Sequence, residues 1–340
     1  MSESSEDPGT SEAPAPALRV VLLPGTRRTG AHAVLDTLTQ FDIATPQQAR
    51  WLATFHAKVF ELAGVVPTDA RPQAAFLLAN TGSQPDLREE ARAWLRRQLD
   101  VQPQLLLHEP RIAFLASFWR EIVISCDAGP GFVGVQRPPA DIAHGAQPSG
   151  PLSDAGHLAS WLNAQLTYER STRDQPRSFL LYDDLLDDWT GPIMRLGQAL
   201  DLPAVLECGP QGIRRVHHTL AEQAPLPTSP VPLAESEAPT ALVDLCAQAW
   251  AALQALTADP ADAAAEAALD DVAEGYRLLY LEAEAVARSS INAAREAGKA
   301  FVRSQAADAG AAATAPAAPV KPAVPEPPRA TRRWARRSRA

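Results

Sequence analysis

Cysteine is scarce in this sequence, and none of its cysteines has a spacing that binds metal. Cys126, Cys208 and Cys246 are the only three among 340 residues, and they stand far apart. A structural zinc site needs paired Cys or His residues at short intervals, so we expect no metal site. Disulfide-stabilised secreted domains are much richer in cysteine, which favours a protein of a reducing compartment.

Long apolar segments and an excess of basic residues are also missing. No segment reaches the roughly 20 apolar residues that a membrane-spanning helix needs, and the acidic N-terminus lacks the basic and apolar regions of a signal peptide. Lys and Arg number 31 against 40 Asp and Glu, which gives a formal net charge of -9. We therefore expect a cytoplasmic protein without a transmembrane segment and without a specific nucleic-acid partner.

The two ends of the chain differ in composition from the rest. Residues 1–17 are acidic, whereas residues 304–340 are rich in Ala and Pro and end in TRRWARRSRA. Neither end offers enough apolar periodicity to offset chain entropy, so we expect both to be disordered. A tail arginine near an anionic surface contributes up to ~1 kcal/mol, so contact with such a surface is the alternative to an idle solvated tail.

Four short apolar runs predict the strands of one parallel sheet. They cover residues 19–23, 104–107, 132–135 and 178–182. Strands that alternate with helices indicate an α/β domain, here residues 18–235, with a P-loop-like doubly wound parallel sheet flanked by helices. An α-helical C-terminal extension follows over 236–303. The helical patterns cover residues 46–63, 86–99, 113–122, 154–173, 192–200, 238–256 and 261–304.

The first strand runs into a loop that suits an anion. Gly25 and Gly30 let the backbone approach a ligand closely, and the following helix N-terminus presents unpaired N–H groups. Arg27 and Arg28 add positive charge. The loop lacks the Gly-Lys-Ser/Thr of nucleoside triphosphatases, and no lysine follows Gly30, which argues against a nucleotide kinase.

The other strands also end in polar residues. His108, Glu109 and Arg111 follow the second strand, Arg137 the third, and Tyr182 with Asp183 the fourth. Because ligands of doubly wound sheets bind at the carboxyl ends of the strands, these residues form one candidate site.

At these four places the chain resembles the bacterial sulfotransferases that use 3′-phosphoadenosine-5′-phosphosulfate (PAPS). Their 5′-phosphosulfate loop resembles GTRRTGAH at 25–32, and their K-D-P-R segment resembles HEPRIAFLASFW at 108–119. Their 3′-phosphate strand and loop resemble FVGVQRPPADIA at 132–143, and their strand ending in Y-E-D-L-L resembles RSFLLYDDLLDDW at 177–189. The resemblance spans roughly residues 18–202 of the chain.

The resemblance implies transfer of a sulfuryl group from PAPS to a hydroxyl, with sugars among the candidate acceptors and no metal. Arg28 and the loop amides would hold the 5′ end, and Arg137 the 3′-phosphate. His108 would lie nearest the reacting group with Arg28, and Glu109 and His32 are alternative bases. The implied donor site comprises Gly25, Arg27, Arg28, Thr29, Gly30, His32 and Arg137.

The chain departs from the family pattern near both substrates. Ala31 and His32 stand where relatives carry a hydroxyl residue, and His108 stands where they carry lysine. Gly145 replaces a serine, and Gln47 or Gln48 occupies the place of a glutamate. The competing hypothesis is therefore a catalytically degenerate protein that keeps the fold and binds a protein partner through the C-terminal helix.

Several residues keep two interpretations at this stage. His108 can act as a base or, when charged, replace the lysine. Arg137 can bind phosphate or form a salt bridge with Asp141. The basic run 214–218 is expected in a solvated loop, and its alternative is to close over the phosphates of the donor. The helix 261–304 either packs on the domain or projects from it.

Overall fold

The computed structural model describes residues 18–25, 28–47, 49–144 and 152–314. Within them four parallel strands form one sheet in the order β2-β1-β3-β4. Val21 of β1 stands opposite Leu106 of β2 on one side and Gly131 of β3 on the other. The strands are β1 (Arg19–Leu23), β2 (Gln104–His108), β3 (Gly129–Gln136) and β4 (Arg177–Leu181). The predicted α/β class with a parallel sheet flanked by helices is confirmed.

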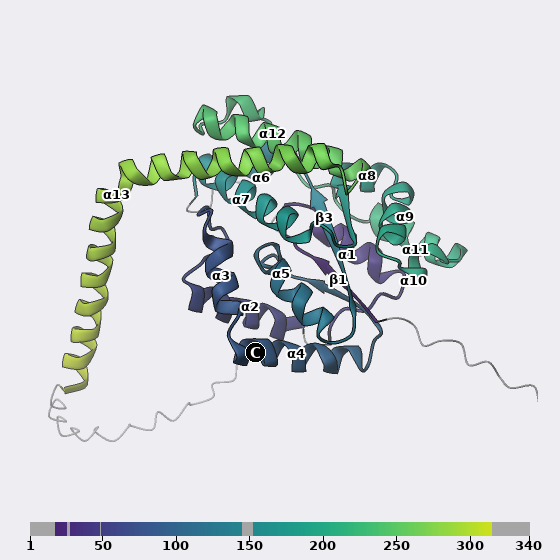
Figure 1. Cartoon of the computed structure of the whole chain (residues 1–340), viewed down its shortest axis with the longest axis horizontal. Coiled ribbons are helices and arrows are strands. Elements are labelled where there is room, and N and C mark those ends of the chain that lie inside the picture. The colour runs from purple at the N-terminus through teal and green to yellow at the C-terminus, as the bar shows by residue number, and fades with distance from the viewer. Residues whose placement is uncertain (1–17, 26–27, 48, 145–151, 315–340) are drawn as a thin grey trace, which may run out of the picture. The chain divides into compact units, whose positions relative to one another are not determined.

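The strands are nearly continuous apolar runs because both faces of the sheet are covered. On one face Val20, Leu107 and Phe132 pack against an aromatic core that includes Trp94 and Trp119. Figure 1 shows helices of this layer around β1 and β3. They are α2 (Ala49–Ala63), α3 (Ala74–Gly82), α4 (Pro85–Leu99), α5 (Ile112–Ile124) and α7 (Asp154–Thr172).

The other face carries a smaller apolar cluster. Val21, Leu106 and Val133 point into it, as the two-residue period of a strand requires, and Val34 packs there from the first helix. This layer contains α1 (Ala31–Thr39), α8 (Tyr182–Asp187), α9 (Thr190–Ala199), α10 (Pro203–Leu206) and α11 (Pro210–Ala221). We call it the α1 face.

The C-terminal helices begin as part of the domain. Helix α12 (Thr240–Ala258) packs against β4 and α7. It alone among the described helices is long and apolar enough to cross a membrane, by length and composition only, and Cys246 and Leu253 on it are fully buried in the core. The contacts of the chain divide it after Ala283, within α13 (Ala263–Thr314).

Two predictions need correction or extension. The basic run 214–218 lies on α11, not in a loop, because Val216 and Leu220 bury one side of an amphipathic helix. The C-terminal helix continues to Thr314, whereas its sequence pattern predicted an end at residue 304. Of the tail predicted to be disordered, 304–340, residues 304–314 are helical instead. The predicted disorder of residues 1–17 and 315–340 lies outside the described residues.

Candidate functional site

The strand order places a crevice between β1 and β3. The chain leaves β1 toward β2 at one edge and leaves β3 toward β4 at the other, which makes this pair the topological switch point. Their register ends at Leu22 and Phe132, and beyond it the Tyr168 hydroxyl lies 3.3 Å from the Leu22 oxygen and 3.1 Å from that of Val133. Ligands of doubly wound sheets bind at such a fork.

Two described residues of the loop after β1 have a left-handed backbone. Arg28 has φ 76° and Gly30 has φ 83°, both in the left-handed region. The other described non-glycine residues with positive φ are all aspartates, which tolerate this region better than arginine. A left-handed arginine costs roughly 1–2 kcal/mol. Strain of this kind clusters at functional sites, and alternating conformations make successive N–H groups converge on an anion.

Gly25 and His108 meet at the β2 side of this loop. A Cβ atom at Gly25 would overlap the His108 ring, so glycine is needed for the two strand ends to approach. His108 also contacts the exposed His32 edge to face, with ring centroids 4.8 Å apart. The structure therefore brings Gly25, His32 and His108 together beside the N-terminus of α1.

The surroundings of His108 fix its protonation state. Its Nδ1–H donates to the Leu23 carbonyl at 3.0 Å, which leaves Nε2 with a lone pair. Burial lowers the pKa of His108 below 6.5, the proximity of His32 lowers it further, and the bond to Leu23 only partly opposes this. The ring is neutral at neutral pH, so His108 suits a base and not a cation in place of lysine.

Arg137 lies inside the protein, at 1% exposure. Its Nη1 donates to the Arg28 carbonyl at 2.9 Å, and its Nη2 donates at 3.1 Å both to Asp141 Oδ2 and to the Pro227 carbonyl. The guanidinium also stacks over the Tyr182 ring, 5.2 Å from its centroid. The salt-bridge interpretation of Arg137 is confirmed, and a phosphate here would compete with Asp141.

Arg28 is likewise engaged with protein. Its Nη1 donates to the Ile142 carbonyl at 2.5 Å, near the end of the short helix α6 (Pro139–His144). The neighbouring Gly30 packs against the Tyr182 ring so closely that a Cβ would overlap it. The loop, α6 and the end of β4 thus form one packed unit around Arg137.

Glu109 lies on the other side of the sheet from His108. Its Oε2 accepts the Nδ1–H of His56 at 2.5 Å and the backbone N–H of Arg111 at 2.9 Å. Because Trp119 Nε1 donates to His56 Nε2 at 2.7 Å, His56 is neutral with its proton on Nδ1. Glu109 anchors α2 to the turn before α5 and does not face the α1 N-terminus.

The open space at the switch point is small. A cavity of about 20 Å³ lies among Pro24, Thr29, Gln136, Gln165 and Tyr168, which is room for one water-sized group. Gln136 is 1% exposed, and its Oε1 has no hydrogen-bond partner among the described residues.

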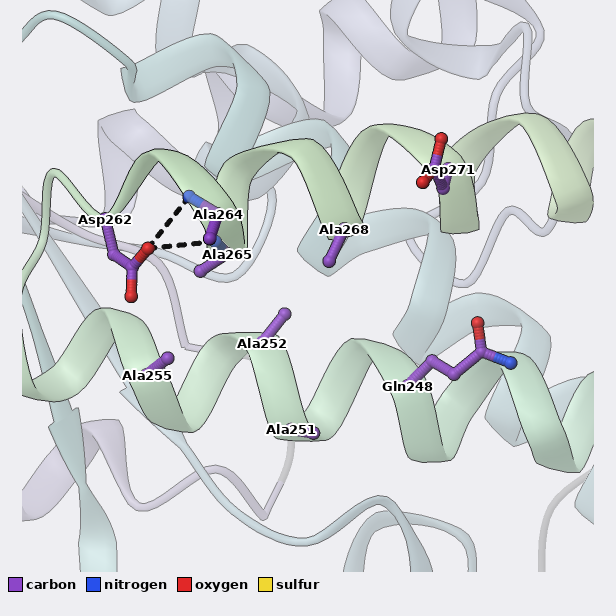
Figure 2. Close-up of a pocket in the computed structure, with 9 residues that line it drawn as sticks. All are labelled: Gln248, Ala251, Ala252, Ala255, Asp262, Ala264, Ala265, Ala268 and Asp271. Atoms are coloured by element: carbon purple, nitrogen blue, oxygen red, sulfur yellow. Dashed lines mark hydrogen bonds between the residues drawn. The ribbon is translucent and has the colours of Figure 1, made fainter.

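A larger groove lies away from the strand ends. It has a volume of about 390 Å³ between α12 and α13 and is lined by six alanines with Gln248, Asp262 and Asp271 (Figure 2). Asp262 Oδ1 accepts the backbone N–H groups of Ala264 and Ala265, so it caps α13. The lining of the groove holds no cation and no histidine, cysteine or hydroxyl side chain, and we assign it no chemistry.

The remaining predicted site residues are only partly described by the structure. Thr29 is 4% exposed and lines the cavity, whereas Arg27, Gln48 and Gly145 lie outside the described residues. Gln47 is exposed, and its backbone N–H donates to Gln98 Oε1 at 3.0 Å. No group of three or more His, Cys, Asp or Glu residues that could hold a metal occurs among the described residues.

Sequence reasoning missed the residues that cover the site. Leu226, Pro227 and Ser229 contact Tyr182, Arg137 and Asp141, yet their segment shows only a repetition of proline.

Comparison with protein-family models, with curated proteins and with solved structures finds no significant match for this chain.

Proposed function

We propose that this edge of the sheet binds PAPS and that the protein transfers its sulfuryl group to a hydroxyl acceptor. The observation that carries the proposal is the strained β1–α1 loop at the switch point, with Arg28 and Gly30 both left-handed. His108 and Arg137 flank it from the two neighbouring strands, and both face the α1 side. A neutral base, an N–H-rich loop and an arginine are the groups that sulfuryl transfer needs.

Each group has a role set by its geometry. The loop N–H groups and the α1 N-terminus would stabilise charge on the phosphosulfate, as in phosphoryl transfer. His108 Nε2 would take the proton of the acceptor hydroxyl as the new O–S bond forms and the bond to the bridging oxygen breaks. The Leu23 carbonyl would hold the ring and its Nδ1 proton in place throughout.

Binding of the desulfonated donor, 3′,5′-bisphosphoadenosine (PAP), tests the donor site. Arg137→Lys keeps a cation beside Asp141 but loses the planar fork that binds phosphate through two hydrogen bonds. We expect micromolar binding by wild type in a calorimetric titration and at least about a tenfold loss in the variant.

Arg177→Lys is the matched control. Arg177 is 5% exposed and pairs with Glu169 and Glu266, but it stands at the start of β4, the opposite end of the sheet. Equal losses of PAP affinity from the two substitutions would mean that Arg137→Lys weakens binding only by destabilising the fold. Turnover of labelled PAPS with sugars as hydroxyl acceptors then tests transfer.

The second candidate is a degenerate protein that keeps the fold and binds a partner through its C-terminal helices. The pairing of Arg137 with Asp141 favours it, because that ion pair offers a phosphate no net positive charge. Failure of PAP to bind any form of the protein would select this alternative.

A further inference from the structure

A proline-rich segment crosses the site on the α1 face. Residues 225–230, PLPTSP, follow α11, and we call them the strap. Proline fixes φ near one value, so Pro225, Pro227 and Pro230 leave the free strap few conformations. Little entropy is lost when such a segment docks.

Hydrogen bonds join the strap to Tyr182, Arg137 and Asp141. The Leu226 N–H donates to the Tyr182 hydroxyl at 3.1 Å, and the Pro227 carbonyl accepts from Arg137 Nη2 at 3.1 Å. The Ser229 N–H donates to Asp141 Oδ1 at 2.7 Å. Each bond ends on a residue that follows β3 or β4, the strands flanking the predicted 3′-phosphate position.

Asp141 connects the strap to the arginine. The carboxylate is 6% exposed, and it uses Oδ2 for Arg137 and Oδ1 for Ser229. An amide hydrogen bond to a buried carboxylate is among the stronger contacts of a loop. A phosphate on Arg137 would meet both the Pro227 carbonyl and the negative charge of Asp141, so ligand and strap cannot use the guanidinium together.

We infer that the strap is an internal competitor of the donor, held in place by its hydrogen bond to Asp141. The donor then binds only when the strap has left Arg137. The inference rests on the proposed donor site. The measured affinity is then the affinity of the open form reduced by the fraction of molecules that are open. Weakening the hydrogen bond between Ser229 and Asp141 raises the open fraction. PAP then binds more tightly, although no contact to the ligand has been added.

The test is PAP binding by Ser229→Pro, which removes the N–H that donates to Asp141 and also the hydroxyl that hydrogen-bonds with Val231 beside the strap. Loss of this charge-assisted hydrogen bond increases the open population, and we expect about tenfold tighter binding than in wild type. Thr228→Pro is the control, because exposed Thr228 makes no hydrogen bond with any described residue. This substitution introduces the same proline ring into the strap as Ser229→Pro does. The PAP affinity of Thr228→Pro should equal that of wild type.

Hydrogen exchange gives an independent measurement on the wild-type protein. Saturating PAP should speed exchange at the Leu226 and Ser229 amides, because the strap leaves its acceptors. Slower exchange at these amides would identify a lid that closes over the ligand and would overturn the competition. Equal PAP affinities of wild type and Ser229→Pro would overturn it while leaving the donor site intact. No binding by either protein would overturn the donor site and the strap inference together.

Discussion

Burial sets the chemistry of individual residues around β2. His56 is fully buried between Trp119 and Glu109, and burial lowers its pKa below the ordinary 6.5 despite the opposing effect of Glu109. The unfolded chain therefore binds a proton at pH values where the folded protein does not. Since stability rises with pH wherever the unfolded state binds more protons, His56 stabilises the fold fully above pH 6.5 and less as the pH falls below it.

Urea unfolding between pH 8 and pH 5 measures this effect. The wild-type free energy of unfolding should fall below about pH 6.5 with a contribution from His56 of up to roughly 1.4 kcal/mol per pH unit. His56→Gln keeps a donor for Glu109 and an acceptor for Trp119 but cannot titrate, so its profile should be flatter. Parallel profiles for wild type and His56→Gln would contradict the buried neutral His56.

The orientation of the site residues was partly available from the sequence. Side chains alternate between the faces of a strand, so His108 shares the α1 face with Leu106, and Glu109 points to the other. This period alone separates the two candidate bases. The partners of Arg137 could not be predicted in the same way, because Pro227 lies 90 residues away and reaches it only through the tertiary fold.

Whole elements were predictable where a local pattern dominates. The strands followed from apolar runs, and β1 spans residues 19–23 as predicted. Helix α3 was missed because AAFLLANTG lacks a clear polar face, and its exposed Phe76 breaks the expected period. The strap was missed for a different reason: proline repetition marks an irregular segment but carries no information on what that segment covers.

The junction of loop and helix gives a prediction about Gly30. Alanine at this position meets both the cost of a left-handed backbone and overlap with the Tyr182 ring. The backbone term is roughly 1–2 kcal/mol, and displacement of a packed side chain adds about 1–3 kcal/mol. Urea unfolding of Gly30→Ala should therefore show a loss of about 2–5 kcal/mol.

Gly64 separates the two contributions. It also has positive φ, at 62°, but a Cβ there meets nothing within 4 Å. Gly64→Ala should lose only the backbone term, roughly 1–2 kcal/mol. If both variants lost the same free energy, the close packing of Gly30 on Tyr182 would be wrong.

At the scale of the whole molecule, α13 divides into a part that belongs to the core and a part that does not. Leu269 and Val272 are 1% exposed and Tyr276 is 3% exposed. The Tyr276 hydroxyl donates to the carbonyls of Ala70 and Ala159. No described side chain after Ala283 is buried. The sequence left packing and projection of this helix open, and the segment up to Ala283 packs on the domain.

Two truncated chains test this division. A chain that ends at Ala283 should unfold at the same temperature as the full protein, because it keeps all the side chains of α13 that the structure describes as buried. A chain that ends at Asp262 loses Leu269, Val272 and Tyr276, each worth about 1.5–3 kcal/mol, and should unfold at a much lower temperature or fail to fold. Tyr276→Phe removes only the hydroxyl, so it should lower the free energy of unfolding by about 1 kcal/mol. Such a loss would show that Tyr276 packs against the domain in the full chain. A clear drop in melting temperature for the chain ending at Ala283 would mean that residues 284–340 stabilise the domain, and the helix would then have to be treated as one element.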